Sequence, residues 1–365
     1  MSKFNQFKKL YQDNKFDLLL KDKDSVFWLK LRSISRKELL LDFCAQNGIT
    51  PAGAKGAALF EYIYESKPDG KVVDKFIDKR YSIERAERKS NETKLVSELY
   101  KMKVLDWGGI YQNNLEKSIV DNYIKKIQDF DILNKKIEGA IHDSVRGYVQ
   151  SSWFNHWTSI LIEDVFKDND KVIPTIGLIK KVDFFISNVP FDLKVTYFPE
   201  GYMLARRKAL GIPTEIQLLK RFAKTKKIKF DHLQKEKVIA SELLTRISER
   251  EDAESKKFID EFKEIRWKIV QDTAKDKKAL IKWLYEEQGE RRFDAANRLF
   301  LVLIDKENMD ESWKMKRNVD LLRDDVNLYL NKFDPKDISK LDIEFDWIDG
   351  NKYNTVSDAI FVIKK

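Results

Sequence analysis

Apolar residues recur three or four positions apart through residues 1–135, for example in residues 39–43 and 59–64. This spacing places them on one face of a helix, so the first third of the chain is predicted to be helical. The stretch 82–102 is mostly charged and is expected to form an exposed helix. A turn at residues 106–109 (DWGG) separates it from the next predicted helix.

A change of period marks the beginning of a predicted sheet. Residues 136–166 have helical spacing, after which alternation and β-branched side chains predict strands over 178–186 and 191–197. The residues between them, 188–190, are expected to form a hairpin turn. Helical spacing returns between about 200 and 290.

The last third of the chain returns to strands. Residues 299–304 are uninterruptedly apolar, which is typical of a central strand covered on both faces. A helix is predicted over 312–333, followed by a strand at 341–347 whose alternation leaves one face in water. A turn at Asp349–Gly350 then precedes a final strand at 359–363.

The order of these elements predicts an α/β (α+β) protein, with a small mixed sheet flanked by helices and a helical region before it. We therefore expect a helical N-terminal domain over 1–135. The remainder, 136–365, should form a second domain interrupted by a helical insertion at about 200–290.

Composition excludes several kinds of chemistry. The 365 residues include one cysteine, Cys44, and three histidines, so a disulfide framework or a metal site built from thiolates or imidazoles is not expected. No apolar run reaches the roughly 18–20 residues that span a bilayer, and the polar N-terminus has no signal core. We expect a soluble cytoplasmic protein with no membrane partner.

The positive charge is concentrated in one segment. Lys and Arg exceed Asp and Glu by 69 − 60 = +9 in the chain, and by 11 − 3 = +8 within residues 201–237 alone. Such a block, with Tyr202, Phe222 and Phe230 among the cations, suits contact with a phosphate backbone. A solvated helix face is the alternative. The candidate DNA-binding residues are Arg206, Arg207, Lys208, Lys220, Arg221 and Lys224.

Acidic residues and one lysine could meet at the predicted hairpin. Asp192 and Lys194 are two apart on one strand and leave it on the same face, while Asp183 lies on the partner strand. Glu163 or Asp164 ends the preceding helix. Converging carboxylates form a hard oxygen site suited to Mg²⁺, and a nearby lysine can help to deprotonate water. Alternatively, these carboxylates are surface groups paired with Lys180, Lys181 or Lys194.

The segment Val182-Asp183, followed after eight residues by Asp192-Leu193-Lys194, resembles the signature of the PD-(D/E)xK nuclease superfamily. The resemblance implies a restriction-endonuclease-like fold, with Asp183 and Asp192 as metal ligands. It also implies Lys194 as the catalytic lysine and Glu163 as the supporting helix carboxylate. Val182 stands where the superfamily name has proline, and Asp164 remains an alternative to Glu163.

The resemblance implies a Mg²⁺-dependent endonuclease for double-stranded DNA, most simply a type II restriction enzyme acting as a homodimer. Two other functions stay open. One is a repair, recombination or phage-defence nuclease, and the other is a catalytically silent nucleic-acid-binding protein. A helical scaffold whose basic block is merely solvated would bind no DNA.

Residues 39–64 are similar to the SAP-type helix–extended loop–helix motif, in which a glycine turn presents a lysine, here Lys55, to the DNA backbone. An ordinary helical hairpin is the alternative. The glycines do not form a phosphate loop, because no Ser or Thr follows Lys55 and no strand precedes them, so no nucleotide cofactor is expected.

Overall fold

A computed structural model describes residues 1–51, 53–105, 115–177, 179–287 and 295–364. The turn predicted at 106–109 lies outside the described residues, as does Leu178. The chain forms two compact units. The first consists of residues 1–193 and 313–335, and the second of residues 194–312 and 336–365. The predicted boundary near residue 135 therefore falls within the first unit.

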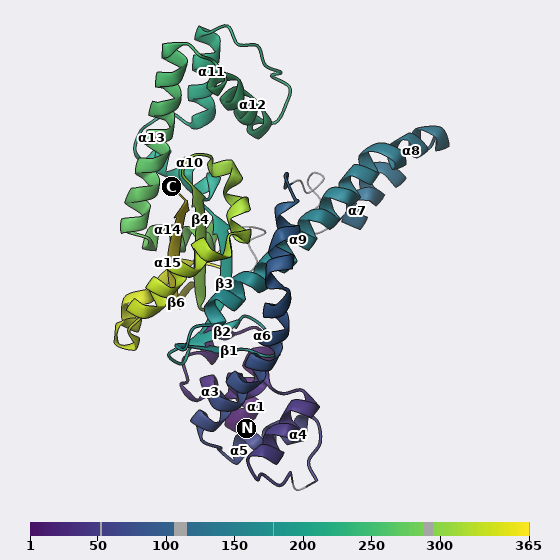
Figure 1. The fold of residues 1–365 in the computed structure, drawn as a ribbon, viewed down its shortest axis with the longest axis vertical. Coiled ribbons are helices and arrows are strands. Elements are labelled where there is room, and N and C mark those ends of the chain that lie inside the picture. The colour runs from purple at the N-terminus through teal and green to yellow at the C-terminus, as the bar shows by residue number, and fades with distance from the viewer. Residues whose placement is uncertain (52, 106–114, 178, 288–294, 365) are drawn as a thin grey trace. The chain divides into compact units, whose positions relative to one another are not determined.

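The first unit is mainly helical (Figure 1). Its helices are α1 (Lys3–Gln12), α2 (Phe16–Leu19), α3 (Asp24–Ser33), α4 (Lys37–Gln46), α5 (Ala57–Glu65), α6 (Gly70–Tyr100), α7 (Leu115–Ile119), η1 (Val120–Ile124), α8 (Phe130–Lys136), η2 (Ile137–Ile141), α9 (His142–Lys167) and α15 (Val319–Lys332). Its strands are β1 (Val172–Pro174), β2 (Phe184–Ile186) and the first half of β3 (Val189–Tyr197).

The second unit begins within β3, at Lys194. Its other elements are α10 (Glu200–Ala209), α11 (Glu215–Thr225), α12 (Glu236–Ser248), α13 (Ala253–Lys275), α14 (Lys278–Glu287), β4 (Arg298–Asp305), β5 (Asp342–Asp346) and β6 (Lys352–Lys364). Two short helices lie where the chain passes between the units, η3 (Met309–Arg317) and η4 (Pro335–Leu341). The helical stretch predicted at 200–290 is thus confirmed as α10 to α14.

The strands form one mixed sheet in the order β1-β2-β3-β4-β6-β5. β1, β2 and β3 pair antiparallel, β4 and β6 pair parallel, and β5 pairs antiparallel with β6. As predicted, residues 299–304 form a strand buried on both faces, and β5 alternates between exposed and buried residues. The mixed α+β class is confirmed.

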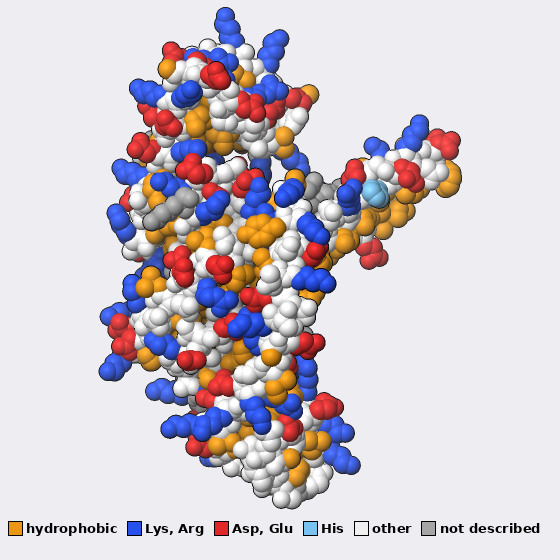
Figure 2. All heavy atoms as spheres, in the orientation of Figure 1, with side chains coloured by type: hydrophobic (Ala, Val, Ile, Leu, Met, Phe, Trp, Pro, Cys, Tyr) orange, Lys and Arg blue, Asp and Glu red, His pale blue; other side chains and the backbone are white. Residues whose placement is uncertain are grey.

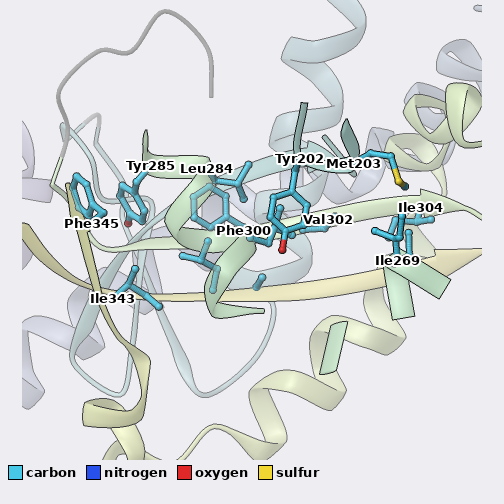
Figure 3. Close-up of a cluster of buried hydrophobic side chains, with 14 of the residues drawn as sticks. Tyr202, Met203, Ile269, Leu284, Tyr285, Phe300, Val302, Ile304, Ile343 and Phe345 are labelled. Atoms are coloured by element: carbon cyan, nitrogen blue, oxygen red, sulfur yellow. The ribbon is translucent and has the colours of Figure 1, made fainter. Parts of the chain in front are cut away.

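The core of the second unit lies against one face of β4 (Figure 3). Phe300, Val302 and Ile304 project from this strand towards α10 and α14, whose apolar faces are buried. Tyr285 of α14 stacks on Phe345 of β5, with 4.6 Å between the ring centroids. Apolar burial of this extent supplies the main stabilisation of such a unit.

Two local predictions around the hairpin differ from the structure. The strand expected over 178–186 is only β2, because Lys181 has a φ of 61° and breaks the extended backbone. The hairpin turn is formed by Ser187 and Asn188, both with positive φ, as in tight two-residue hairpins. Pro190, expected in the turn, lies in β3 opposite Phe185.

Helix α6 is less exposed than its charge suggested. Tyr81, Arg85 and Leu99 are buried, although most of its other residues between 82 and 100 are solvated. The long helix predicted over 136–166 is confirmed by η2 and α9. Within the described ranges, no helix is both long and apolar enough to cross a membrane.

Candidate functional site

Asp183 directly precedes β2, at the end of the β2–β3 hairpin away from the turn. Its backbone N–H donates to the carbonyl of Phe191 at 2.8 Å, and its carboxylate Oδ2 accepts a hydrogen bond from the N–H of Leu193 at 2.7 Å. The side chain thus takes the place of a backbone acceptor at the end of the ladder. Since Leu193 stands between Asp192 and Lys194, the structure brings Asp183 beside the Asp-Leu-Lys segment.

Asp192 and Lys194 differ in exposure. Asp192 is 4% exposed and Lys194 is half-buried, and both lie on β3 two residues apart, which directs their side chains to the same face. Carboxylate oxygens are the ligands that Mg²⁺ prefers. Among the residues described, however, no three His, Cys, Asp or Glu side chains meet as a cation site.

The N-terminal helices hold the hairpin from its turn end. Lys30 of α3 donates to the side-chain oxygen of Asn188 at 2.7 Å and to Asp74 of α6 at 2.9 Å. The segment before β2 is anchored in the same way, because the N–H of Lys180 donates to the hydroxyl of Tyr11 at 2.7 Å. A rigid support of this kind keeps side chains at the hairpin in fixed positions.

The two candidate helix carboxylates, Glu163 and Asp164, lie in different environments. Glu163 of α9 accepts a hydrogen bond from Lys167, one turn later, at 2.8 Å, and its side chain is 32% exposed. Asp164 is buried and accepts from Tyr81 at 3.0 Å and from Arg88 at 2.8 and 2.9 Å. Asp164 is therefore a structural residue, and Glu163 remains the candidate.

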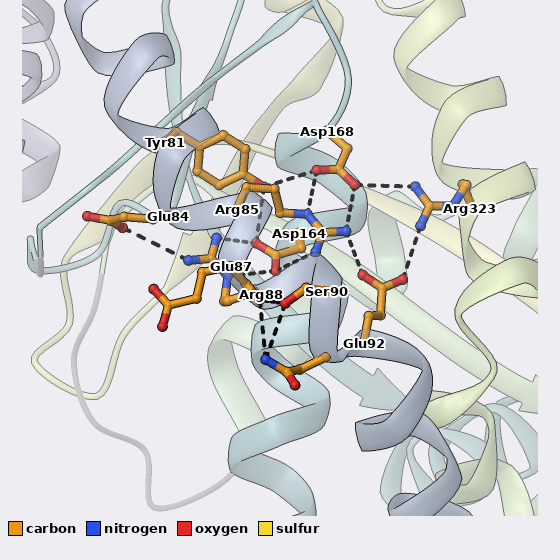
Figure 4. A network of polar contacts seen from close by, with 11 residues as sticks. Tyr81, Glu84, Arg85, Glu87, Arg88, Ser90, Glu92, Asp164, Asp168 and Arg323 are labelled. Carbon is orange, nitrogen blue, oxygen red and sulfur yellow. Dashed lines mark hydrogen bonds and ion pairs between the residues drawn. The ribbon is translucent and has the colours of Figure 1, made fainter.

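Asp164 belongs to a polar network that joins α6, α9 and α15 (Figure 4). Arg85 donates to both oxygens of Asp168 at 2.8 and 2.9 Å and to Glu92 at 2.6 Å, while Arg323 of α15 lies 3.4 Å from Asp168. Burial alone would raise the pKa of Asp168, but the hydrogen bonds and charge of Arg85 outweigh it and lower that pKa below its usual value.

The sequence pattern did not predict this network. The hydrogen-bonded residues of this network lie up to 155 positions apart in the sequence, and a charged helix predicts exposure rather than buried ion pairs. The one signal in the sequence was the density of arginine and acid in α6. Arginine forms such pairs well because its planar fork binds both carboxylate oxygens.

The predicted DNA-binding residues do not share one environment. Lys208, Arg221 and Lys224 are exposed, whereas Arg206 and Lys220 are partly buried. Arg207 is fully buried, donates from Nε to the carbonyl of Pro213 at 2.8 Å and lies 3.6 Å from Glu215. The prediction that Arg207 contacts DNA is wrong, because its guanidinium is inside the second unit.

Helix α11 shows why sequence spacing alone could not separate core residues from exposed basic residues. Its apolar side packs on α12 and α13 through Leu219 and Ala223, and Phe222 stacks on Phe258 at 4.1 Å between centroids. The opposite side exposes Arg221 and Lys224. Phe222 and the buried Tyr202 thus belong to the core, so the expected interleaving of aromatic and basic contacts is wrong for them.

Residues 39–64 have the element order of the helix–loop–helix motif. Residues 47–51 and 53–56 lie between α4 and α5, and Gly48, Gly53 and Gly56 adopt the positive φ that glycine tolerates best. Lys55 is exposed in this loop. Its use for binding DNA stays a prediction.

No family model matches this chain, and the searches of curated proteins and of solved structures found no match either.

Proposed function

We propose that this protein is a Mg²⁺-dependent endonuclease that hydrolyses phosphodiester bonds of double-stranded DNA. One observation carries the proposal. The carboxylate of Asp183 is hydrogen-bonded, at 2.7 Å, to the backbone of the segment that bears Asp192 and Lys194. Two carboxylates and one amine on a rigid hairpin are the groups that metal-assisted phosphodiester hydrolysis needs.

The residues fit a magnesium ion by their chemistry, since both acids offer hard oxygen atoms and no soft ligand is nearby in the sequence. Asp183 and Asp192 would hold the ion through their carboxylate oxygens. When bound, Mg²⁺ would neutralise the charge that develops on the phosphate. Lys194 would orient a water molecule and accept its proton as the water attacks phosphorus and the 3′-oxygen leaves. Glu163 is the supporting helix carboxylate in this proposal.

The DNA partner is assigned to the basic surface of the second unit. Lys208, Arg221 and Lys224 are exposed, so each can approach a phosphate. Cutting both strands of a duplex with one site per chain calls for two chains, and a homodimer would match a symmetric recognition sequence. We therefore propose a type II restriction enzyme.

Cleavage of plasmid DNA tests the proposal. The wild-type chain should convert supercoiled plasmid to discrete fragments with Mg²⁺ and not with EDTA. Asp192→Asn and Lys194→Met should each lower the rate by about 100-fold or more, as expected when a metal ligand or a proton acceptor is lost. Lys180→Met, an exposed lysine near the same hairpin, is the matched control and should cut normally.

Two results would contradict the proposal. Undiminished cleavage by Asp192→Asn would remove the assigned site. Salt-dependent DNA binding without cleavage by the wild-type chain would instead favour a silent nucleic-acid-binding protein on the same fold.

A further inference from the structure

The first half of α9 and the turn before it expose a row of apolar side chains. Residues Ile137, Ile141, Val145, Val149 and Trp153 follow one another four positions apart. Four of them are 38–56% exposed, and Ile141 is partly exposed. Side chains four apart form a ridge along one face of a helix. Figure 2 shows apolar side chains gathered on this projecting part of the first unit.

The other side of the helix is already covered. Ser144, Gly147 and Ser151 are buried, and α7 lies beside this part of α9 (Figure 1). The apolar row lies on the other side of α9, and in the part of the chain that the structure describes it is open to solvent. An exposed apolar row of this length is typical of an interaction surface.

A polar row runs directly beside the apolar one. Glu138, His142, Arg146 and Gln150 each follow a residue of the apolar row by one position and are exposed. The row is negative at one end and positive near the other. Against a parallel copy it would align like charges, whereas against an antiparallel copy it would place Glu138 near Arg146.

We propose that this face of α9 is the interface with a second copy of the same chain, related by a two-fold axis near the level of residues 141–145. Ile141 then faces Val145 of the other copy, and Ile137 faces Val149, because each pair is equally distant from the axis. Glu138 pairs with Arg146 twice, as a two-fold interface requires. A partner with a different sequence would not need this self-complementary order of charges.

The ridge also determines how the two helices cross. Ridges of residues four apart pack into each other at about −50°, the commonest crossing of helices in globular proteins. Contact is then limited to a few turns around the axis. The buried centre is Ile141 and Val145, flanked by Ile137 and Val149, and the Glu138–Arg146 pairs lie at its edge.

Sedimentation analysis over a concentration series tests the interface. The wild-type chain should form dimers, and Val149→Glu should weaken them about 100-fold, because a charge would be buried in the contact. Ile83→Glu on α6 is the matched control, since Ile83 is 57% exposed and Val149 is 56% exposed. This control should leave the dimer unchanged.

Charge reversal tests whether the partner at this face of α9 is a second copy of the chain. Glu138→Arg and Arg146→Glu should each weaken the dimer about tenfold by placing like charges together, and the double variant should restore it. A monomeric wild-type chain, or a dimer insensitive to Val149→Glu, would overturn the proposal. So would a failure of the double variant to recover, with circular dichroism showing that it folds.

The inference supplies the contact between the two chains that the proposed function needs. Its test does not depend on catalysis, however. A dimer without nuclease activity would contradict only the proposed function. A monomer that cleaves DNA would contradict only the proposed interface on α9.

Discussion

Asp183 combines a structural and a chemical role in one side chain. Its Oδ2 accepts the Leu193 N–H at the end of the β2–β3 ladder, and we propose the same carboxylate as a magnesium ligand. A charged acceptor for a backbone amide gives a stronger hydrogen bond than a neutral one. Stability and activity should therefore respond differently to substitutions at this position.

Replacing Asp183 with alanine should lower the free energy of unfolding by about 1–3 kcal/mol, since the Leu193 amide loses its acceptor. Asp183→Asn should cost less because the amide oxygen can still accept. Both variants should lose cleavage. Urea denaturation and plasmid cleavage measure the two effects, and an Asp183→Asn enzyme with normal activity would contradict the assignment.

At the scale of elements, buried charges join α6, α9 and α15. Asp164 of α9 and Asp168, directly after this helix, accept from Arg88 and Arg85 of α6, while Arg323 extends the network to α15. Removing one partner of a buried ion pair is costly because the other charge stays behind without compensation. These helices should consequently separate more easily at low pH.

Asp168 allows this pH dependence to be measured. Its pKa in the folded protein lies below the ordinary 3.8, chiefly because the hydrogen bonds from Arg85 outweigh the effect of burial. The stabilisation is complete above the unfolded pKa and is lost as pH falls through the folded pKa. Asp168→Asn should lower the melting temperature at pH 7 and flatten its fall below pH 4. Asp170→Asn is the control, and an unchanged acid profile in Asp168→Asn would contradict this account.

Helix α11 provides a second prediction at this scale. Arg221 and Lys224 are exposed on it, whereas Arg207 is enclosed beside its N-terminus. Arg221→Ala combined with Lys224→Ala should weaken DNA binding and reduce the slope of log affinity against log salt by about 2, since two phosphate contacts are lost. Arg207→Met should alter stability and leave that slope unchanged. Fluorescence anisotropy at several salt concentrations measures it, and equal slopes for all variants would exclude α11 from the interface.

At the scale of the whole molecule, the chain forms two compact units and passes from the first to the second within β3. The candidate metal ligands and the proposed dimer contact belong to the first unit, and the basic surface of α11 belongs to the second. In the proposed function, cutting of both DNA strands would need two chains, whereas cutting of one strand would need only one site.

A variant with a weakened dimer interface should separate the cutting of one DNA strand from the cutting of both. Val149→Glu should still nick one strand of a supercoiled plasmid but linearise it much more slowly than the wild-type chain, because each monomer carries one site. Agarose gels resolve nicked from linear DNA. Linearisation at the wild-type rate by a monomeric variant would show that one chain cuts both strands.

Local pattern was enough to predict most elements. The 3.6-residue and 2-residue periods belong to single helices and strands, so α9, β4, β5 and the helical stretch at 200–290 could be predicted without any contact information. The same reasoning failed where one residue decides the backbone, as at Lys181 and Pro190, because periodicity does not report a positive φ or a strand-compatible proline.

The sequence by itself therefore determined the mixed α+β class, the hairpin that carries Asp183, Asp192 and Lys194, and the position of the basic block. Only the tertiary structure decided which charged groups are exposed to solvent and which are buried. It enclosed Arg207, placed Asp164 in an ion-pair network and exposed the apolar row of α9. The physical reason is that periodicity reflects which face of an element is apolar, whereas burial of a charge depends on partners from distant parts of the chain.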